Sequence, residues 1–166
     1  MTRRNTLLGL GIGSVVASVA GLRGLLGSAP AQAATKVAYE LTRTDAEWKT
    51  QLQPAQYRVL RQAGTETPYT SPLNKEKRSG VYSCAGCALP LFSSKTKFES
   101  GTGWPSFWQA MDKAVAEESD TTLFMKRVEV LCRRCGGHLG HVFDDGPQPT
   151  GLRYCMNGVA LNFKEV

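Results

Sequence analysis

Histidine, long apolar runs and clustered basic residues are all scarce in this 166-residue chain. Only two histidines occur, against five cysteines. The longest apolar run, residues 7–20, is diluted by glycine and serine. It is also shorter than the roughly 20 predominantly apolar residues that cross a membrane as a helix. The run therefore argues against a membrane-spanning helix.

A basic stripe and a known nucleic-acid-binding module are also absent. Lysine and arginine are scattered along the chain, and the one cluster, residues 75–78, is interrupted by Glu76. Recognition of nucleic acid needs basic side chains gathered on one face or a recognisable binding module. The sequence therefore predicts no nucleic-acid partner.

The first 33 residues differ in kind from the rest of the chain. Arg3 and Arg4 precede the apolar run, and Ala31-Gln32-Ala33 forms a small-x-small cleavage site. A basic start, a short apolar core and such a site are typical of a secretory signal peptide. Adjacent arginines are typical of the twin-arginine type. We expect residues 1–33 to direct export, to the periplasm, with no stable membrane insertion after cleavage; retention as an anchor is the alternative.

The remaining 133 residues have the length of one domain with its own core. Three arginines leave with the signal, so the formal net charge falls from +6 to +3. We expect residues 34–43 to be a tether and residues 44–166 to be a single domain.

Two short helices are predicted at the start of this domain. Thr44-Asp45-Ala46-Glu47 is a capping box that opens a helix. Pro54 suits the first turn of a second helix that ends at Gly64. Short alternating segments separated by glycine and proline then predict strands at residues 81–83, 89–92, 114–118, 123–131, 141–143 and 153–163. The fold class is therefore mainly β, with short amino-terminal helices.

Four of the five cysteines form two Cys-x-x-Cys pairs, Cys84/Cys87 and Cys132/Cys135. Two such pairs are typical of a tetrahedral metal site whose ligands are all sulfur, so we expect one structural Zn²⁺. Iron also binds four thiolates, and the spacing does not exclude it. The alternatives are two disulfides, or a dithiol redox motif beside a second pair. Redox motifs normally occur singly near a βαβ pattern, which this sequence lacks.

Cys155 is the one cysteine outside these pairs. A free cysteine often packs as a small hydrophobic residue. Alternation along a strand, however, places Arg153, Cys155 and Asn157 on one face, and a neighbouring arginine favours the thiolate. Cys155 is therefore a candidate nucleophile.

His138 and His141 follow the second cysteine pair directly. They are either hydrogen-bonded structural residues or the proton donors and acceptors that thiol chemistry needs near neutral pH. Trp104 lies in a glycine-rich loop, where an aromatic face suits a methyl or thioether group. We take Trp104 and Phe107 as candidate substrate-binding residues, although Phe107 or the adjacent Trp108 is expected to belong to the core.

Taken together, these segments resemble the B-type methionine sulfoxide reductases, the peptide-methionine (R)-S-oxide reductases. The resemblance runs from about Asp45 to Phe163. It rests on Tyr82-Ser83-Cys84-Ala85-Gly86-Cys87, Ser100-Gly101-Thr102-Gly103-Trp104-Pro105-Ser106-Phe107, Cys132-x-x-Cys135 with His138-Leu139-Gly140-His141-Val142-Phe143, Asp145-Gly146-Pro147 and Arg153-Tyr154-Cys155-x-Asn157. It implies two antiparallel β-sheets, a structural zinc away from the active site, and a catalytic domain over residues 44–166.

The resemblance also implies a role for each candidate residue. Cys155 would be the nucleophile, assisted by Arg153, and His138, His141 and Asn157 would surround the sulfoxide oxygen. Trp104 would hold the substrate's ε-methyl group. The expected activity is reduction of methionine-(R)-sulfoxide in oxidised proteins, through a sulfenic acid on Cys155, which would repair exported proteins after oxidative stress. A non-catalytic zinc-binding interaction module and a thiol–disulfide oxidoreductase are the alternatives.

The chain departs from this family at Thr102. Many members have a recycling cysteine at that position, between Gly101 and Gly103. With the other four thiols on the metal, Cys155 has no obvious internal partner. We therefore expect an external thiol, either a thioredoxin-like protein or a small thiol, to act as the reductant.

Overall fold

Two helices and nine strands form the part of the chain that the computed structural model describes, residues 38–122 and 126–166. These residues belong to one unit, Val37–Val166. The helices are α1 (Asp45–Gln51) and α2 (Pro54–Gln62), and single 3₁₀ turns are η1 (Pro72–Lys75), η2 (Ser94–Thr96) and η4 (Gly158–Ala160). The strands are β1 (Gly80–Cys84), β2 (Pro90–Ser93), β3 (Lys97–Phe98), β4 (Ser106–Phe107), β5 (Val115–Asp120), β6 (Arg127–Cys132), β7 (His138–Phe143), β8 (Arg153–Met156) and β9 (Leu161–Glu165).

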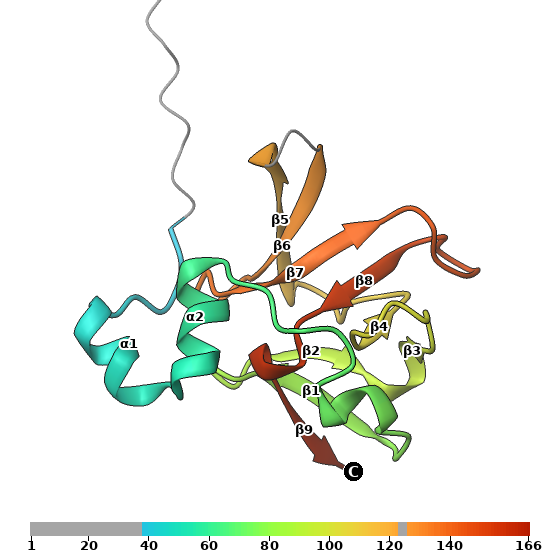
Figure 1. Cartoon of the computed structure of the whole chain (residues 1–166), viewed down its shortest axis with the longest axis horizontal. Helices are drawn as coiled ribbons and strands as arrows, with labels where there is room; N and C mark the ends of the chain where they lie inside the picture. The colour runs from blue at the N-terminus through green and yellow to red at the C-terminus, as the bar shows by residue number, and fades with distance from the viewer. Residues whose placement is uncertain (1–37, 123–125) are drawn as a thin grey trace, which may run out of the picture. The chain divides into compact units, whose positions relative to one another are not determined.

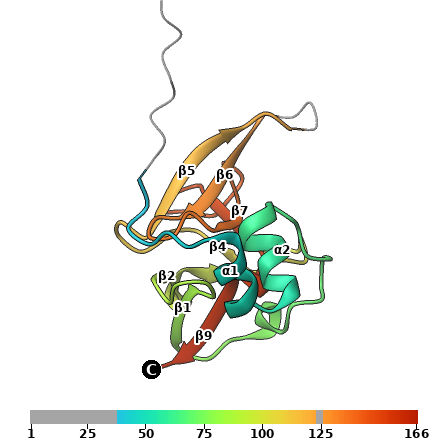
Figure 2. The ribbon, with the colours of Figure 1, turned by 90° about the vertical axis from the view of Figure 1, so that its left-hand side faces the viewer.

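The strands form two antiparallel sheets, which confirms the predicted fold class. The smaller sheet has the order β2-β1-β9, and the larger has the order β3-β4-β8-β7-β6-β5 (Figure 1). The β5–β6 hairpin reaches away from the smaller sheet in both ribbon views (Figure 2). Helix α2 packs on β7 and η4.

Aromatic side chains join the two sheets. Phe92 of the smaller sheet stacks on Phe107 of the larger sheet, with ring centroids 4.4 Å apart. Tyr82 meets the same Phe107 ring edge-on at 4.9 Å, and Phe92 also contacts Tyr154. Phe92, Phe107 and Tyr82 are fully buried, so this cluster is the centre of the core.

The helix boundaries follow the local signals in the sequence. The Thr44 hydroxyl accepts a hydrogen bond from the Glu47 amide, and the Glu47 carboxylate accepts one from the Thr44 amide at 2.7 Å. Pro54 occupies the first turn of α2, and Ala63 ends it in a left-handed conformation. Both predicted helices are confirmed.

The predicted strand over residues 153–163 is wrong, because the chain changes sheets within it. β8 belongs to the larger sheet and β9 to the smaller sheet, and η4 separates them. A side chain at Gly158 would collide with Ser71, so the turn at this point depends on a residue distant in sequence. The predicted strand 123–131 begins at Arg127; residues 123–125 lie outside the described residues.

The described part of the expected tether packs against the domain. The Leu41 amide donates a hydrogen bond to the Arg134 carbonyl at 2.9 Å. The Tyr39 ring covers Gly136 so closely that no side chain would fit at that glycine. The predicted signal peptide, residues 1–33, and residues 34–37 lie outside the described residues. Within the described ranges, no helix has the length and hydropathy to cross a membrane.

Candidate active site and metal cluster

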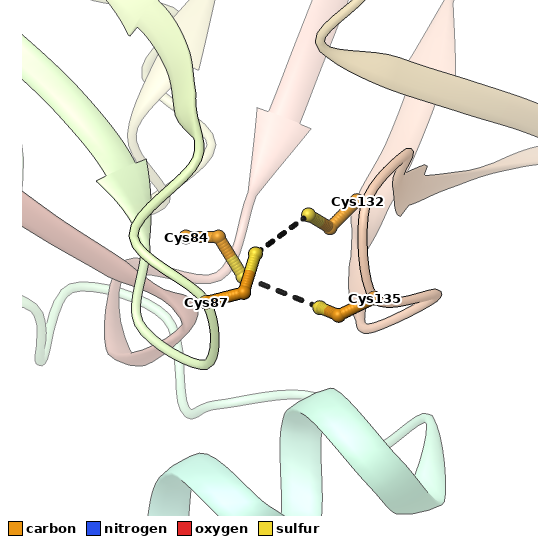
Figure 3. A group of neighbouring side chains, drawn as sticks. All are labelled: Cys84, Cys87, Cys132 and Cys135. Atoms are coloured by element: carbon orange, nitrogen blue, oxygen red, sulfur yellow. Dashed lines mark hydrogen bonds between the residues drawn. The ribbon is translucent and has the colours of Figure 1, made fainter. Parts of the chain in front are cut away.

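The two cysteine pairs meet at the junction of the sheets. Cys84 ends β1 of the smaller sheet and Cys132 ends β6 of the larger sheet, and Cys87 and Cys135 lie in the turns that follow (Figure 3). Their Sγ atoms all lie within 4.8 Å of one another. The Sγ–Sγ distances are 3.8 Å for Cys84–Cys135 and 3.4 Å for Cys87–Cys132. The predicted four-sulfur cluster is therefore confirmed.

The geometry of this cluster fits a tetrahedral metal ion. Metal–sulfur bonds of about 2.3 Å place tetrahedral sulfurs roughly 3.8 Å apart. The four cysteines are free thiols in the structure. The neighbouring Cys132 sulfur, more than any other cause, raises the pKa of the Cys84 and Cys135 thiols. A bound cation removes that penalty because metal ligands bind as thiolates.

Cys155 lies apart from this cluster, in β8 of the larger sheet. It pairs in register with Ser106 on one side and His141 on the other. A cavity of about 140 Å³ opens over it. The residues that line this cavity are Thr65, Trp104, Arg127, Gly140, His141, Phe143, Cys155 and Asn157. None of the four cluster cysteines is among them.

Arg153 places a positive charge beside Cys155. Burial alternates along β8, with Tyr154 and Met156 buried and Arg153 and Cys155 only partly buried, as predicted. The Arg153 guanidinium donates two hydrogen bonds to Asp145, at 2.7 and 2.9 Å. The Asp145 carboxylate, with a smaller contribution from Cys155, raises the pKa of Arg153. The Arg153 cation is therefore held in place beside Cys155.

Each histidine is hydrogen-bonded to a carboxylate. His138 Nδ1 lies 2.6 Å from Glu129 Oε1, and His141 Nε2 lies 2.9 Å from Asp120 Oδ2. The two rings are 5.5 Å apart. Burial lowers the pKa of His141, and the hydrogen bond that His141 makes to the Asp120 carboxylate opposes this shift. Both side chains are therefore held in fixed orientations. His141 lines the cavity over Cys155, whereas His138 is buried beside the His141 ring and is not among the lining residues.

Trp104 and Asn157 are held through the backbone of Glu66. The Trp104 indole donates to the Glu66 carbonyl at 3.1 Å, and the Asn157 Oδ1 accepts from the Glu66 amide at 2.9 Å. Asn157 Nδ2 also donates to the Leu139 carbonyl at 3.0 Å. A side-chain amide has two N–H donors, and Asn157, which lines the cavity, uses one of them among the described residues.

The structure corrects the placement of Phe107 among the substrate-binding residues. Its side chain has no exposed surface and stacks on Phe92 in the core. The glycine-rich loop ends at β4, and Phe107 is the β4 residue that points between the two sheets. Trp104, earlier in the same loop, does line the cavity.

Comparison with known proteins agrees with this geometry. The SelR domain model matches residues 52–165. Two relatives carry the name peptide methionine sulfoxide reductase MsrB. The protein from Leptospira interrogans serogroup Icterohaemorrhagiae serovar Lai is 54% identical over 128 residues, which are 76% of this chain and 98% of the relative. The protein from Methanosarcina barkeri is 58% identical over 123 residues, 74% of this chain and 87% of the relative.

The chain belongs to the SelR family and is a peptide methionine sulfoxide reductase of the MsrB type. The enzyme class predicted from the sequence is thereby confirmed. The alternative, a non-catalytic zinc-binding interaction module, is not supported. Among solved structures, a crystal structure of the Mis18 "Yippee-like" domain covers 54% of this chain, with a TM-score of 0.44 and 17% identity. That likeness is too distant to bear on function.

Sequence reasoning missed three carboxylates of this reductase. Glu129 and Asp120 hold the histidines, and Glu66 accepts hydrogen bonds from the Gly158 and Val159 amides. Glu129 could have been noticed in the sequence, because it lies between Val128 and Val130 in a predicted strand that precedes the histidine segment. Glu66 could not have been, because it lies in an irregular loop and all of its partners are distant in sequence.

Thr102 occupies the position at which the family resemblance led us to look for a recycling cysteine. Its hydroxyl is 3.7 Å from Cys155 Sγ and 2.8 Å from the Ser100 hydroxyl. The Ser100 hydroxyl is in turn 2.7 Å from that of Ser106. Cys155 thus has a hydroxyl neighbour, while the other four cysteines of the chain are gathered in the metal cluster.

Proposed function

We propose that this reductase restores methionine from methionine-(R)-sulfoxide in exported proteins, with Cys155 as the nucleophile. One observation carries the assignment of the nucleophile. Cys155 and His141 are partners in register across β8 and β7, and both line the cavity that also contains Trp104. A thiol, a proton carrier and an aromatic surface therefore converge on one small space.

The reaction transfers one oxygen atom to sulfur. The Cys155 thiolate attacks the sulfoxide sulfur, the sulfur–oxygen bond of the substrate breaks, and the oxygen ends on Cys155 as a sulfenic acid. The substrate sulfur gains two electrons and the cysteine sulfur loses two. The proton that leaves the Cys155 thiol ends on the transferred oxygen, and His141 carries it.

The cavity residues would bind the substrate, and Arg153 beside the cavity would interact with the charge on Cys155. Trp104 offers its ring face to the methyl group of the substrate. Asn157 and His141 line the same cavity, so the second N–H of Asn157 and the protonated His141 ring would be the donors to a sulfoxide oxygen bound there. Arg153, held by Asp145, stabilises the thiolate before attack.

An external thiol completes the cycle in this proposal. A sulfenic acid normally condenses with a second thiol, and Thr102 supplies only a hydroxyl next to Cys155. Removing a cysteine from the metal cluster would cost folding free energy. The sulfenic acid is therefore reduced directly by a thioredoxin-like protein or a small thiol.

The four-sulfur cluster is assigned to structural Zn²⁺, held by Cys84, Cys87, Cys132 and Cys135. Zinc is bound by four thiolates in many structural sites and supplies folding free energy rather than redox chemistry. The cluster joins β1 of one sheet to β6 of the other. This position supports a structural role for the metal ion. Spectra after cobalt substitution, together with metal analysis, distinguish zinc from iron.

Export is proposed from the amino terminus alone. The Arg3-Arg4 pair and the cleavage site of residues 31–33 support a twin-arginine signal. The periplasm oxidises thiol pairs, and a route that carries folded proteins would allow metal to be loaded beforehand. The test is cell fractionation of the full chain and of the Arg3→Lys/Arg4→Lys variant, which should remain inside the cell. Equal export of both proteins would refute the twin-arginine route.

Mass spectrometry after one turnover tests the chemistry. The protein without residues 1–33 is mixed with a methionine-(R)-sulfoxide peptide in the absence of reductant, and Cys155 is then trapped with a sulfenic-acid reagent. One methionine and one labelled Cys155 per protein are expected, while Cys155→Ser gives neither and keeps its metal. Turnover by Cys155→Ser would remove Cys155 as the nucleophile. A stoichiometric disulfide from Cys155 to a cluster cysteine would refute direct reduction.

A further inference from the structure

The two active-site histidines bind their carboxylates through opposite ring nitrogens. His141 uses Nε2 toward Asp120, whereas His138 uses Nδ1 toward Glu129. A neutral imidazole carries its single proton on one nitrogen only, and the hydrogen bond of that nitrogen selects the tautomer. The two rings should therefore be held in opposite tautomers.

Asp120 is built to accept hydrogen bonds. Its Oδ1 accepts from the Thr122 amide at 2.9 Å and the Thr122 hydroxyl at 2.7 Å, and its Oδ2 accepts from Arg127 at 2.7 Å. The Thr122 bonds, followed by the His141 bond, lower the pKa of Asp120. Asp120 therefore stays ionised and can only accept, so His141 must carry its proton on Nε2. Its Nδ1 has no hydrogen-bond partner among the residues that the structure describes.

Glu129 fixes the tautomer of the His138 ring in the same way. Its 2.6 Å bond to Nδ1 of His138 requires the proton on that nitrogen. Nε2 of His138 is buried and has no hydrogen-bond partner among the described residues. A buried unpaired nitrogen costs about 1–3 kcal/mol, and native structures seldom keep one without a use.

Strand register brings these groups to one face of the larger sheet. Glu129 is the register partner of His141, and His141 is the register partner of Cys155. Directly opposed residues of neighbouring antiparallel strands share a face. Carboxylate, imidazole and thiol thus form one row across β6, β7 and β8.

We propose that Asp120 and Glu129 are positioning residues for sulfoxide reduction. They hold His141 and His138 in opposite tautomers. Nδ1 of His141, a residue that lines the cavity over Cys155, is then available to carry the proton from the Cys155 thiol to the sulfoxide oxygen, while the buried Nε2 of His138 is kept as an acceptor beside the His141 ring. The carboxylates also stabilise the imidazolium that forms in between, as an orienting aspartate does in a catalytic triad. This inference rests on the proposed role of Cys155 and the histidines.

Single-turnover kinetics without reductant measure the step in question. Asp120→Asn and Glu129→Gln should each slow methionine formation by about 10- to 100-fold, within the range of general acid–base effects, while the substrate concentration at half-maximal rate stays nearly unchanged. Glu118→Gln is the matched control. Glu118 is the register partner of Glu129 in β5 but contacts Tyr39 instead of a histidine, so its variant should react at the wild-type rate.

Nitrogen-15 spectra of the imidazoles test the positioning directly. At a pH where both rings are neutral, the wild type should show the proton on Nε2 of His141 and on Nδ1 of His138. Asp120→Asn replaces one carboxylate oxygen with an NH₂ donor. In this variant, His141 should no longer be restricted to one tautomer. Equal metal content and melting temperature of each variant exclude a folding defect.

Three results would overturn the inference. They are the reverse or mixed tautomers in the wild type, a lost tautomer in Asp120→Asn with an unchanged single-turnover rate, and a loss of rate in Glu118→Gln equal to that in the other variants. The proposed function is judged separately, because it fails if Cys155→Ser forms methionine or if His138→Asn and His141→Asn both react at the wild-type rate.

Discussion

The four-sulfur cluster and the reactive centre differ in what surrounds the cysteine sulfur. In the cluster, each sulfur lies within 4.8 Å of three others. Cys155 has instead a cation held by Asp145, an imidazole across the strand and the Thr102 hydroxyl at 3.7 Å. The first set of neighbours suits a metal ion and the second suits a nucleophile. The same side chain therefore takes its role from the charges and donors placed around it.

The two regions also differ in how the chain assembles them. The cluster needs two tight turns, each of which brings two cysteines together, and the contact between the two sheets that brings the turns together. The reactive centre needs the register of β4, β8, β7 and β6, together with the loop that contains Glu66. Variants in the cluster should thus act on stability, and variants around Cys155 should act on rate.

Loss of one cysteine pair should have the largest effect. A structural metal contributes on the order of 10 kcal/mol to a small domain, so Cys84→Ser/Cys87→Ser should be unfolded and metal-free by circular dichroism and metal analysis. Cys155→Ser, the control, should keep its melting temperature within a few degrees. A folded Cys84→Ser/Cys87→Ser protein with unchanged melting would show that the two regions do not differ in this way.

Glu66 should show an intermediate effect on both stability and rate. Its side chain is 5% exposed, and it accepts from the Gly158 amide at 2.5 Å and the Val159 amide at 3.0 Å. Each buried amide left unpaired costs about 1–3 kcal/mol, so Glu66→Ala should lose about 2–4 kcal/mol in denaturant unfolding. Its rate should also fall, because the backbone of Glu66 holds Trp104 and Asn157. Glu66→Gln, which keeps one acceptor, should lose less; equal losses in both would contradict this account.

Tyr39 should affect the cluster and leave the reactive centre unchanged. Its ring covers Gly136, next to Cys135. Tyr39→Ala should lose metal to a chelator a few times faster and lose about 1 kcal/mol of stability, a typical value for a partly buried contact. Tyr39→Phe keeps the ring and should resemble the wild type. A slower single-turnover rate in Tyr39→Ala would contradict the prediction that Tyr39 affects the cluster and not the reactive centre.

The smallest expected effect is the change in the stability of the Arg153–Asp145 ion pair at low pH. The Arg153 hydrogen bond holds the pKa of Asp145 below its ordinary value of about 3.9. The unfolded chain therefore takes up this proton first, and the stability that the ion pair contributes is present above about pH 4 and lost as the pH falls further. The melting temperatures of wild type and Asp145→Asn should converge between about pH 5 and pH 2. A gap that stays constant over this range would exclude the ion pair as its cause.

Local patterns were read correctly from the sequence. The capping box at Thr44, the helix start at Pro54 and the pairing of the four cysteines all depend on residues close together in the chain. The alternation of burial along β8 is equally local. The signal peptide and the export route remain predictions, since the described residues begin after them.

Non-local arrangements were missed or misjudged. The strand predicted over residues 153–163 breaks at η4 because Gly158 packs against Ser71. Phe107 belongs to the core because Phe92, from the other sheet, stacks on it. No pattern near either residue reports on these partners.

The sequence by itself determined the two helices, most of the strands, the four clustered cysteines, the family and the identity of the candidate nucleophile, because each depends on short spacings or on contiguous motifs. Only the tertiary structure decided which carboxylate meets which histidine, which aromatic lines the cavity and what stands beside Cys155. Those contacts follow from strand register and from the packing of one sheet on the other. A shift of one residue in register would turn every one of these side chains to the opposite face.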